Sequence, residues 1–251
     1  MSTSPVPDLT TCCAYDYAVD LFGDSAAAHV IRMTGRGGWV LDLGAGSGSI
    51  TRHLALTNGC DVVAVETNPV SLAKLRTFCR KVLPLDLNSP GWAAALGAEA
   101  PFDRVLATDV LEHLHDPWRT LKDMKSLMKP DGAILLSLPH AAHCTVLASL
   151  MQEDFAYGEW GLLDKTHIRF FGIHNIQAML DEAGLAVEAA AFVVRPPERT
   201  ELAEKWARMP PGIQAALTQS PYAHVYQIVV RAGLARDGER GVQLMDVAVE
   251  D

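Results

Sequence analysis

Residues 40–50, which read VLDLGAGSGSI, place three glycines between an apolar run and the start of a helical pattern. Gly44, Gly46 and Gly48 allow the backbone to turn sharply and to approach a ligand closely, because glycine has no Cβ. The helical pattern begins at Ser49, and the free N–H groups at a helix N-terminus attract negative or electron-rich groups. This stretch therefore predicts a binding site for a nucleotide-like ligand.

Glu66 is a second candidate for ligand binding. It directly follows another apolar run, residues 62–65. It stands about twenty residues beyond the glycines, and a carboxylate there can accept hydrogen bonds from two neighbouring hydroxyls of a ribose. An exposed helix cap is the structural alternative. Ser49 occupies the position of the third glycine in the dinucleotide pattern G-x-G-x-x-G, yet NAD remains an alternative ligand.

The pattern D-x-G-x-G-x-G that begins at Asp42 resembles the first motif of the class I S-adenosylmethionine-dependent methyltransferases. The resemblance extends over residues 35–230 and implies S-adenosyl-L-methionine as the cofactor and S-adenosyl-L-homocysteine as the product. The cofactor-binding residues that it implies are Asp42, Gly44, Ala45, Gly46, Gly48, Glu66, Thr67, Asp86, Leu87, Thr108 and Asp109.

Each part of that cofactor has an expected contact. The family places the ribose hydroxyls on the acid that corresponds to Glu66. It places the adenine amino group near Asp86, with Leu87 packed on the ring. The methionine part is expected at Thr108 and Asp109. Two aromatic residues ahead of the first strand, Tyr15 and Tyr17, are candidates to close over the cofactor, as aromatics do in relatives.

Residues 162–171, LLDKTHIRFF, are similar to a run found in a methyltransferase subgroup that accompanies glycan and natural-product biosynthesis enzymes. Those relatives usually have asparagine where this chain has His140. A hydroxyl acceptor must be aligned with the sulfonium methyl and lose its proton, and histidine is the usual base near neutral pH. His167 is the first candidate base, followed by His143 and His140. A purely structural histidine is the alternative for each.

Other residues of the same region suit acceptor binding. Asp164 could orient a histidine or accept a hydroxyl, and Arg169 could bind a phosphate or carboxylate. Tyr157 and Trp160 suit stacking against a sugar face, although packing within a lid explains them equally well.

The sequence predicts no metal site. Glu112, His113 and His115 follow the fourth apolar run in a segment that resembles one common in the family, but the order H-E-x-x-H is absent. Residues two positions apart do not share a helix face, so capping and packing roles are favoured. The five cysteines form no C-x-x-C pair, which is typical of free thiols in a reducing compartment.

Alternating apolar runs and helical patterns must position these residues. Strands are expected at 39–43, 61–66, 82–87, 102–108, 133–138, 185–194 and 222–232. This order predicts an α/β fold: a Rossmann-like, seven-stranded, mostly parallel sheet with helices on both faces and a lid insertion after the fifth strand. The expected organisation is an N-terminal helical segment (1–34), a methyltransferase domain (35–232) with an acceptor-binding insertion (139–173), and a C-terminal tail (233–251).

Bulk composition narrows the partners. The chain has 251 residues, 49% of them hydrophobic, and a formal net charge of −9, which disfavours a nucleic-acid partner. No apolar run approaches the roughly 20 residues of a membrane helix, so stable membrane insertion is not expected. The first ten residues lack the pattern of a signal peptide, which favours a cytoplasmic location. A homodimer is compatible with these features.

The sequence thus predicts a methyltransferase that O-methylates a small polar acceptor such as a sugar or a hydroxylated natural product. N-methylation of an amino sugar or small amine is the first alternative. A protein that binds S-adenosylmethionine without transferring methyl is the second. Methylation of tRNA or protein is disfavoured by the acidic balance.

Overall fold

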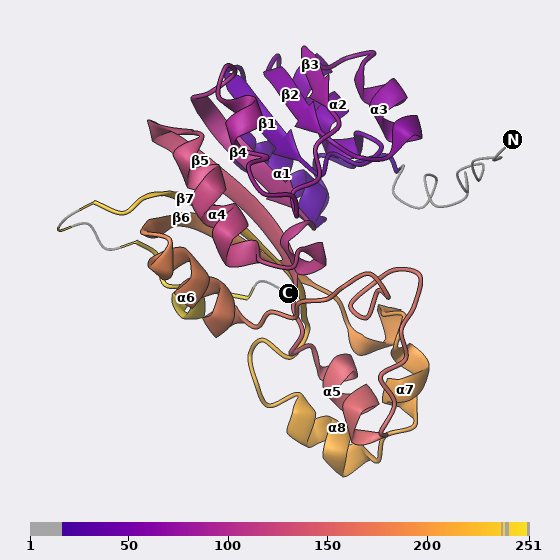
Figure 1. Cartoon of the computed structure of the whole chain (residues 1–251). Coiled ribbons are helices and arrows are strands. Elements are labelled where there is room, and N and C mark those ends of the chain that lie inside the picture. Colours follow the sequence, from indigo (N-terminus) through magenta and orange to yellow (C-terminus); the bar gives the residue numbers. More distant parts are fainter. Residues whose placement is uncertain (1–16, 237, 239–240, 250–251) are drawn as a thin grey trace, which may run out of the picture.

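The computed structural model describes residues 17–236, 238 and 241–249. Seven strands form one sheet in the order β3-β2-β1-β4-β5-β7-β6 (Figure 1). Their bounds are β1 Trp39–Leu43, β2 Asp61–Val65, β3 Lys81–Leu83, β4 Phe102–Thr108, β5 Met128–Pro139, β6 Leu185–Val194 and β7 Val225–Leu234. The expected Rossmann-like architecture is confirmed.

Most neighbouring strands run parallel, and β7 is the exception. β1 pairs in parallel with β2 and with β4, so the carboxyl ends of these three strands lie at one edge of the sheet. β7 runs antiparallel between β5 and β6, with Ile134 opposite Ala232. The beginning of β7 therefore lies at the same edge as the end of β5, and loops from distant parts of the chain meet there.

Helices cover both faces, because successive side chains of each strand point to opposite sides. Leu41 and Leu43 of β1 belong to the core under α4 and α6, whereas Val40 belongs to the core under α1 and α2. The bounds of the helices are α1 Ala26–Thr34, α2 Ser49–Leu56, α3 Pro69–Leu75, α4 Pro117–Ser126, α5 Cys144–Met151, α6 Ile173–Glu182, α7 Ala203–Ala207 and α8 Pro211–Leu217. None of the described helices is long and apolar enough to span a bilayer.

A small helical lobe stands on the carboxyl edge of the sheet, where α5, α7 and α8 gather (Figure 1). Cys144 and Ala148 of α5 pack against Trp206 of α7 and the adjacent Met209. The sequence predicts an acceptor insertion within residues 139–173 alone. The lobe instead combines this segment with the connection between β6 and β7, because neither piece buries its apolar side chains by itself.

Several expected elements differ in extent. β3 covers Lys81–Leu83, where a strand over 82–87 is expected, and β7 covers Val225–Leu234, where a strand over 222–232 is expected. β5 begins at Met128, five residues before the expected start at 133, and its pairing with β4 shifts register between Phe102 and Arg104. Residues 111–128 form a short 3-10 turn and then α4, because Pro117 starts a new helix whose N-cap, Asp116, accepts the N–H of Arg119 at 3.0 Å. The first helix begins only at Ala26, capped by the Ser25 side chain. Part of the expected helix before it lies outside the described residues.

Candidate active site

A cavity of about 650 Å³ opens at the carboxyl edge of the sheet, between the glycine turn and the helical lobe. Its wall combines the ends of β1, β4 and β5, the beginning of β7, and the loop between α5 and α6. The predicted site residues that line it are Asp42, Gly44, Ala45, Gly46, Thr108, Asp109, Trp160, Asp164 and His167. The fold thus brings the expected cofactor turn and part of the expected acceptor segment to one space.

The glycine turn has the geometry that its sequence predicts. Gly44, Gly46 and Gly48 have φ values of 63°, 54° and 87°, a region that favours glycine. A Cβ on Gly44 would come within 2.7 Å of Cγ2 of Val110, whereas a Cβ on Gly46 would meet no atom within 4 Å. Gly46 therefore borders open space that a ligand can enter.

Glu66 lies against this turn. Its carboxylate accepts the N–H of Gly46 at 2.8 Å, and it also accepts the N–H groups of Thr67 at 2.7 Å and Asn68 at 2.8 Å. The first of these bonds joins the end of β2 to the glycine turn. The contact of Glu66 with a ribose stays a prediction, and so does that of Thr67, which is exposed.

Asp42 is buried beneath the turn and accepts the hydroxyl of Thr51 at 2.6 Å. Burial raises the pKa of Asp42 to about 6, against the lowering effect of this hydrogen bond. The pair links the end of β1 to α2 and fixes the entry to the helix.

The proposed adenine contacts lie outside the cavity wall. Asp86 is exposed and accepts the N–H of Asn88 at 2.9 Å, while Leu87 is buried in the main core. The contact of Asp86 with the adenine stays a prediction. The geometry does not support the contact of Leu87, because its side chain is already packed in the core.

Thr108 and Asp109 form the part of the wall contributed by β4. Asp109 has a φ of 52°, and its carboxylate accepts the hydroxyl of Ser137 at 2.7 Å and the side-chain amide of Gln227 at 3.0 Å. Burial raises the pKa of Asp109. The hydroxyl oxygen of Thr108 is buried and bonds no described residue, so it remains available to a ligand.

Glu112 and His167 form the most unusual feature of the cavity. Both carboxylate oxygens of Glu112 are buried, and neither has a hydrogen-bond partner among the described residues. The Nε2 atom of His167 lies 4.0 Å from Oε1 of Glu112, and the Nδ1 atom of the same ring lies 3.3 Å from the carbonyl of Leu162. His113 packs edge-on against the His167 ring at a centroid distance of 4.8 Å.

Burial disfavours the charged form of both groups, so it shifts their pKa values in opposite directions. It raises the pKa of Glu112 well above its ordinary value, an effect that Asp109 and Asp164 reinforce. It lowers the pKa of His167, so this imidazole is neutral at neutral pH. A neutral imidazole with a carboxyl group 4.0 Å from its Nε2 can accept a proton from a bound hydroxyl.

The expectation that this region holds no metal rests on the spacing of Glu112, His113 and His115 in the sequence. The tertiary structure adds a residue from a distant loop, His167, to this group. One ligand atom each from Glu112, His113 and His167 lies within 4.8 Å of the others. His167 comes from a loop far along the chain, so the cluster does not need the H-E-x-x-H pattern. Imidazole and carboxylate ligands of this kind could hold a divalent cation after small side-chain rotations.

The other two candidate bases are held in structural bonds away from the cavity wall. The Nδ1 atom of His140 lies 3.0 Å from the carbonyl of Val225. His143 caps α5: its Nδ1 accepts the hydroxyl of Thr145 at 2.8 Å, and its Nε2 donates to the carbonyl of Arg195 at 3.0 Å. Burial lowers the pKa of both, to about 4 for His143. This geometry favours their structural alternative.

Of the four predicted acceptor-binding residues, two line the cavity and two do not. Trp160 and Asp164 line the cavity, and Asp164 accepts the N–H of Thr166 at 2.8 Å. Arg169 does not line it, because its guanidinium donates to the carbonyls of His115 and Ile168. Tyr157 is exposed and packs against Phe155 outside the cavity wall.

Sequence reasoning missed the contribution of β6 and β7. Arg195, Tyr226 and Gln227 line the cavity from the carboxyl end of β6 and the beginning of β7. No local motif marks them, and only the antiparallel pairing of β7 with β5 brings them to this edge. Tyr17 lines the cavity as expected, whereas Tyr15 lies outside the described residues.

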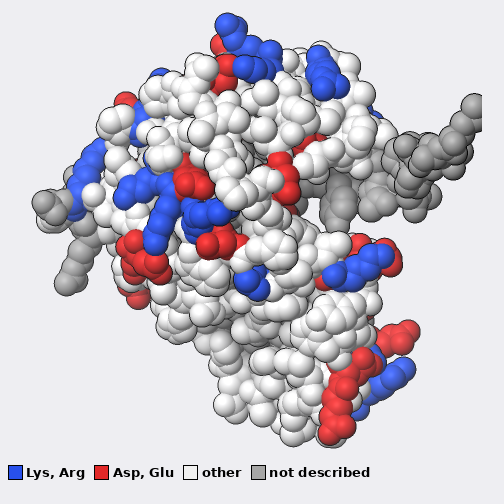
Figure 2. Space-filling model, viewed as in Figure 1, with Lys and Arg blue, Asp and Glu red and all other residues white. Residues whose placement is uncertain are grey.

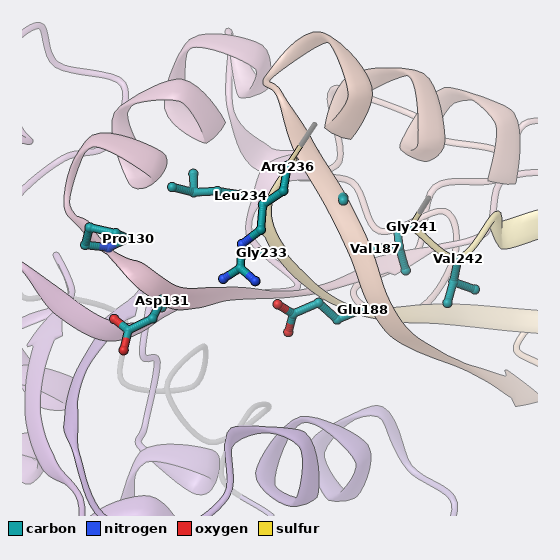
Figure 3. Close-up of a pocket in the computed structure, with 11 residues that line it drawn as sticks. Pro130, Asp131, Val187, Glu188, Gly233, Leu234, Arg236, Gly241 and Val242 are labelled. Carbon is teal, nitrogen blue, oxygen red and sulfur yellow. The ribbon is translucent and has the colours of Figure 1, made fainter. Parts of the chain in front are cut away.

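A second cavity, of about 230 Å³, lies at the opposite edge of the sheet (Figure 3). It is formed by Asp131 near the start of β5, Glu188 of β6, and Arg236 just beyond β7. The amino ends of the parallel strands surround it, so it is remote from the glycine turn. We assign it no part in the site.

The seven-stranded fold, with a cavity at the glycine turn, defines a class I S-adenosylmethionine-dependent methyltransferase. The sequence matches the methyltransferase-domain family over residues 23–190, and the chain belongs to that family. It is an enzyme whose cofactor is S-adenosylmethionine.

Named relatives agree with this assignment. The chain is 27% identical over 172 residues to a ubiquinone biosynthesis O-methyltransferase of Dinoroseobacter shibae, with 67% of this chain and 66% of the relative aligned. It is 33% identical over 170 residues to the enzyme of that name from Xanthomonas euvesicatoria, with 65% and 69% aligned. The chain thus spans about two thirds of the length of these curated relatives.

A solved structure shares the fold. It is the 1,6-didemethyltoxoflavin-N1-methyltransferase of Burkholderia thailandensis with bound S-adenosylhomocysteine, at a TM-score of 0.55 and 19% identity. The match covers 85% of this chain and 80% of that one.

Proposed function

We propose that this enzyme transfers the methyl group of S-adenosylmethionine to a hydroxyl oxygen of a small polar acceptor, such as a sugar or a hydroxylated natural product. One observation carries the proposal: the cavity that contains the glycine turn also contains a buried, unpartnered Glu112 carboxyl group beside the neutral imidazole of His167. A methyl acceptor that starts with a lone pair and no proton to lose would not need this pair.

The cavity divides the work of the reaction. The residues of the glycine turn, Glu66 and Asp109 would hold the cofactor, which supplies the activated methyl group when bound. The residues of the cavity would hold the acceptor hydroxyl in line with the methyl group that the bound cofactor would supply. His167 receives the hydroxyl proton, and the Glu112 carboxyl group, 4.0 Å from Nε2, orients the ring.

The comparisons support oxygen as the acceptor atom, because the relatives reported above are named O-methyltransferases. The structural relative is named an N-methyltransferase, so the fold itself is compatible with either atom. Transfer to the nitrogen of an amino sugar or small amine is therefore the second candidate. The sugar or natural-product acceptor rests on the sequence resemblance alone.

A small-molecule acceptor also suits the charges of the molecule. On the face drawn in Figure 2, the Lys and Arg side chains stand beside Asp and Glu side chains, without a continuous basic band. A nucleic-acid acceptor would require such a band. A homodimer stays a prediction.

The test is transfer of a labelled methyl group from S-adenosylmethionine to matched hydroxyl and amine acceptors. Glu112→Gln should lower the transfer rate by about 100-fold or more while S-adenosylhomocysteine binds with unchanged affinity. The control is Glu159→Gln. It removes an exposed carboxylate that pairs with Lys165 at 2.6 Å in the loop that carries His167. Binding of S-adenosylhomocysteine without transfer to any acceptor would favour a non-catalytic protein and overturn the proposal.

The same assay includes an arm with a chelator. If His167 accepts the hydroxyl proton without a metal ion, EDTA leaves the transfer rate unchanged. Loss of the rate, with recovery on addition of Mg²⁺, would instead assign Glu112, His113 and His167 to a bound cation that lowers the pKa of the acceptor hydroxyl. Either result leaves O-methylation in place and identifies how the hydroxyl is activated.

A further inference from the structure

Arg195 is the sole lysine or arginine among the described residues that line the cavity. The acidic residues that also line the cavity are Asp42, Asp109, Glu112 and Asp164. Arg195 forms no ion pair and no side-chain hydrogen bond with any described residue, although its side chain is partly buried. An arginine that faces a cavity without a carboxylate partner is available to an anionic ligand.

Several contacts hold this side chain in a defined place. The backbone N–H of Arg195 donates to the carbonyl of His224 at 2.9 Å, and its own carbonyl accepts Nε2 of His143 at 3.0 Å. The guanidinium carbon lies 3.9 Å from the centroid of the Tyr226 ring, a cation–π contact that restrains the plane of the group. The hydroxyl of Tyr226 donates to Glu201 at 2.9 Å, which fixes the ring.

The nearby carboxylate of Glu201 is already engaged. One oxygen accepts the Tyr226 hydroxyl, and the other accepts the backbone N–H of Leu162. Glu201 therefore serves the ring under Arg195 and not the guanidinium itself. The Tyr226 ring thus supports Arg195, whose guanidinium has no hydrogen-bond partner among the described residues.

The position of Arg195 separates it from the cofactor. It follows β6, which is four strands away from β1 in the sheet order, and neighbouring strands are about 4.8 Å apart. The root of Arg195 is consequently on the order of 19 Å from the glycine turn, across β4, β5 and β7. Glu112 and His167 belong to the wall between these two ends, so Arg195 stands on the acceptor side.

We infer that the methyl acceptor carries an anionic group, a carboxylate or a phosphate, which the guanidinium of Arg195 binds while the acceptor hydroxyl faces Glu112 and His167. This inference rests on the proposed function and names the substrate class. Arg195 takes the role that the sequence suggested for Arg169. The planar donor fork of arginine binds either oxyanion through two parallel hydrogen bonds.

The experiment compares pairs of related ligands, one with an anionic group and one without. The probes are 3,4-dihydroxybenzoate and its methyl ester, glucuronate and methyl glucuronate, and glucose 6-phosphate and glucose. Binding to the complex of the enzyme with S-adenosylhomocysteine is measured by calorimetry, and methyl transfer is measured in parallel. At least one charged probe should bind about 10-fold to 100-fold more tightly than its neutral counterpart, and the arm that does so identifies carboxylate or phosphate.

Variants of Arg195 complete the test. Arg195→Gln should remove the preference for the charged probe and leave the affinity of its neutral counterpart within about 2-fold, and Arg195→Lys should restore part of it because a point charge replaces the fork. Arg199→Gln is the control, since Arg199 is exposed and outside the cavity. Equal affinity of charged and neutral probes in the unaltered enzyme, or equal loss of both in Arg195→Gln, would overturn the inference.

The two readouts separate this inference from the proposed function. Charge-selective binding without methyl transfer would retain the anion site and contradict O-methylation. Transfer to neutral and charged acceptors at equal rates would retain O-methylation and contradict the anion site.

Discussion

The Nε2 atom of His167 lies 4.0 Å from Oε1 of Glu112, although the two residues are 55 positions apart in the chain. The N–H groups of Ile168 and Arg169 donate to the carbonyl of Glu112 at 2.9 and 3.0 Å, and these bonds hold the loop against the segment after β4. The position of the candidate base thus depends on the backbone of the residue whose side chain faces it.

The pH dependence of methyl transfer should report on this pair. Because burial lowers the pKa of His167, the neutral, proton-accepting form persists below pH 6.5. The rate should therefore rise with pH through an apparent pKa below 6.5 and stay level at neutral pH. The measurement is kcat/KM as a function of pH.

The substitution His167→Asn tests whether His167 causes this pH dependence. The variant should lose about 100-fold or more in rate and should no longer show the acidic limb. His115→Asn is the control, because His115 is exposed and outside the cavity wall. An acidic limb that persists in His167→Asn would assign the titrating group elsewhere.

Protein stability should depend on pH through His143. Its pKa falls from 6.5 to about 4 on folding, so the unfolded chain binds the proton more readily between these values. The contribution to the free energy of unfolding is complete above pH 6.5 and is lost as the pH falls toward 4. The shift corresponds to about 3 kcal/mol as an order of magnitude.

Urea unfolding at pH 7.5 and at pH 4.5 measures this contribution. The loss of stability on acidification should be smaller in His143→Gln than in the unaltered protein, since glutamine does not titrate. Other buried groups, such as Asp42, titrate in both proteins and cancel in the comparison. Identical losses in the two proteins would contradict the prediction.

The glycine turn offers a matched pair of substitutions. Gly46→Ala should cost about 1–2 kcal/mol in stability, because alanine disfavours the positive φ but meets no atom within 4 Å. Gly44→Ala should cost about 1–3 kcal/mol more, since its Cβ would overlap Cγ2 of Val110 at 2.7 Å. Denaturant unfolding measures both.

Ligand binding should rank the same two variants differently from stability. Gly46→Ala fills space beside the turn and should weaken S-adenosylhomocysteine binding in a protein that stays folded. Full affinity in that variant would show that the ligand does not approach Gly46.

Glu66→Gln tests the expected ribose contact. The affinity for S-adenosylhomocysteine should fall about 10-fold to 100-fold, because a charged acceptor of hydroxyl donors becomes a neutral one. Calorimetry measures the affinity, and Glu182→Gln, an exposed acid on α6, is the control. Unchanged affinity in Glu66→Gln would leave Glu66 the purely structural role that its bonds to Gly46, Thr67 and Asn68 already describe.

Local patterns predicted the two central strands of the sheet well, whereas β3 ends four residues before the expected position. β1 and β4 begin and end where the apolar runs predict, because buried strands bounded by turn residues leave a clear signal. The glycine turn was equally clear, since a positive φ at Gly44 restricts the residue type more strongly than burial does.

Sequence by itself determined the class of protein and the end of the cavity that suits the cofactor, because both depend on residues that are neighbours in the chain. Only the tertiary structure decided which polar residues meet at the other end. It brings His167 within 4.0 Å of Glu112 and places Arg195 in the cavity wall. It also engages Arg169 and His143 in hydrogen bonds to backbone carbonyls outside that wall. Such long-range meetings follow from strand order and from packing of the helical lobe, and no local spacing encodes them.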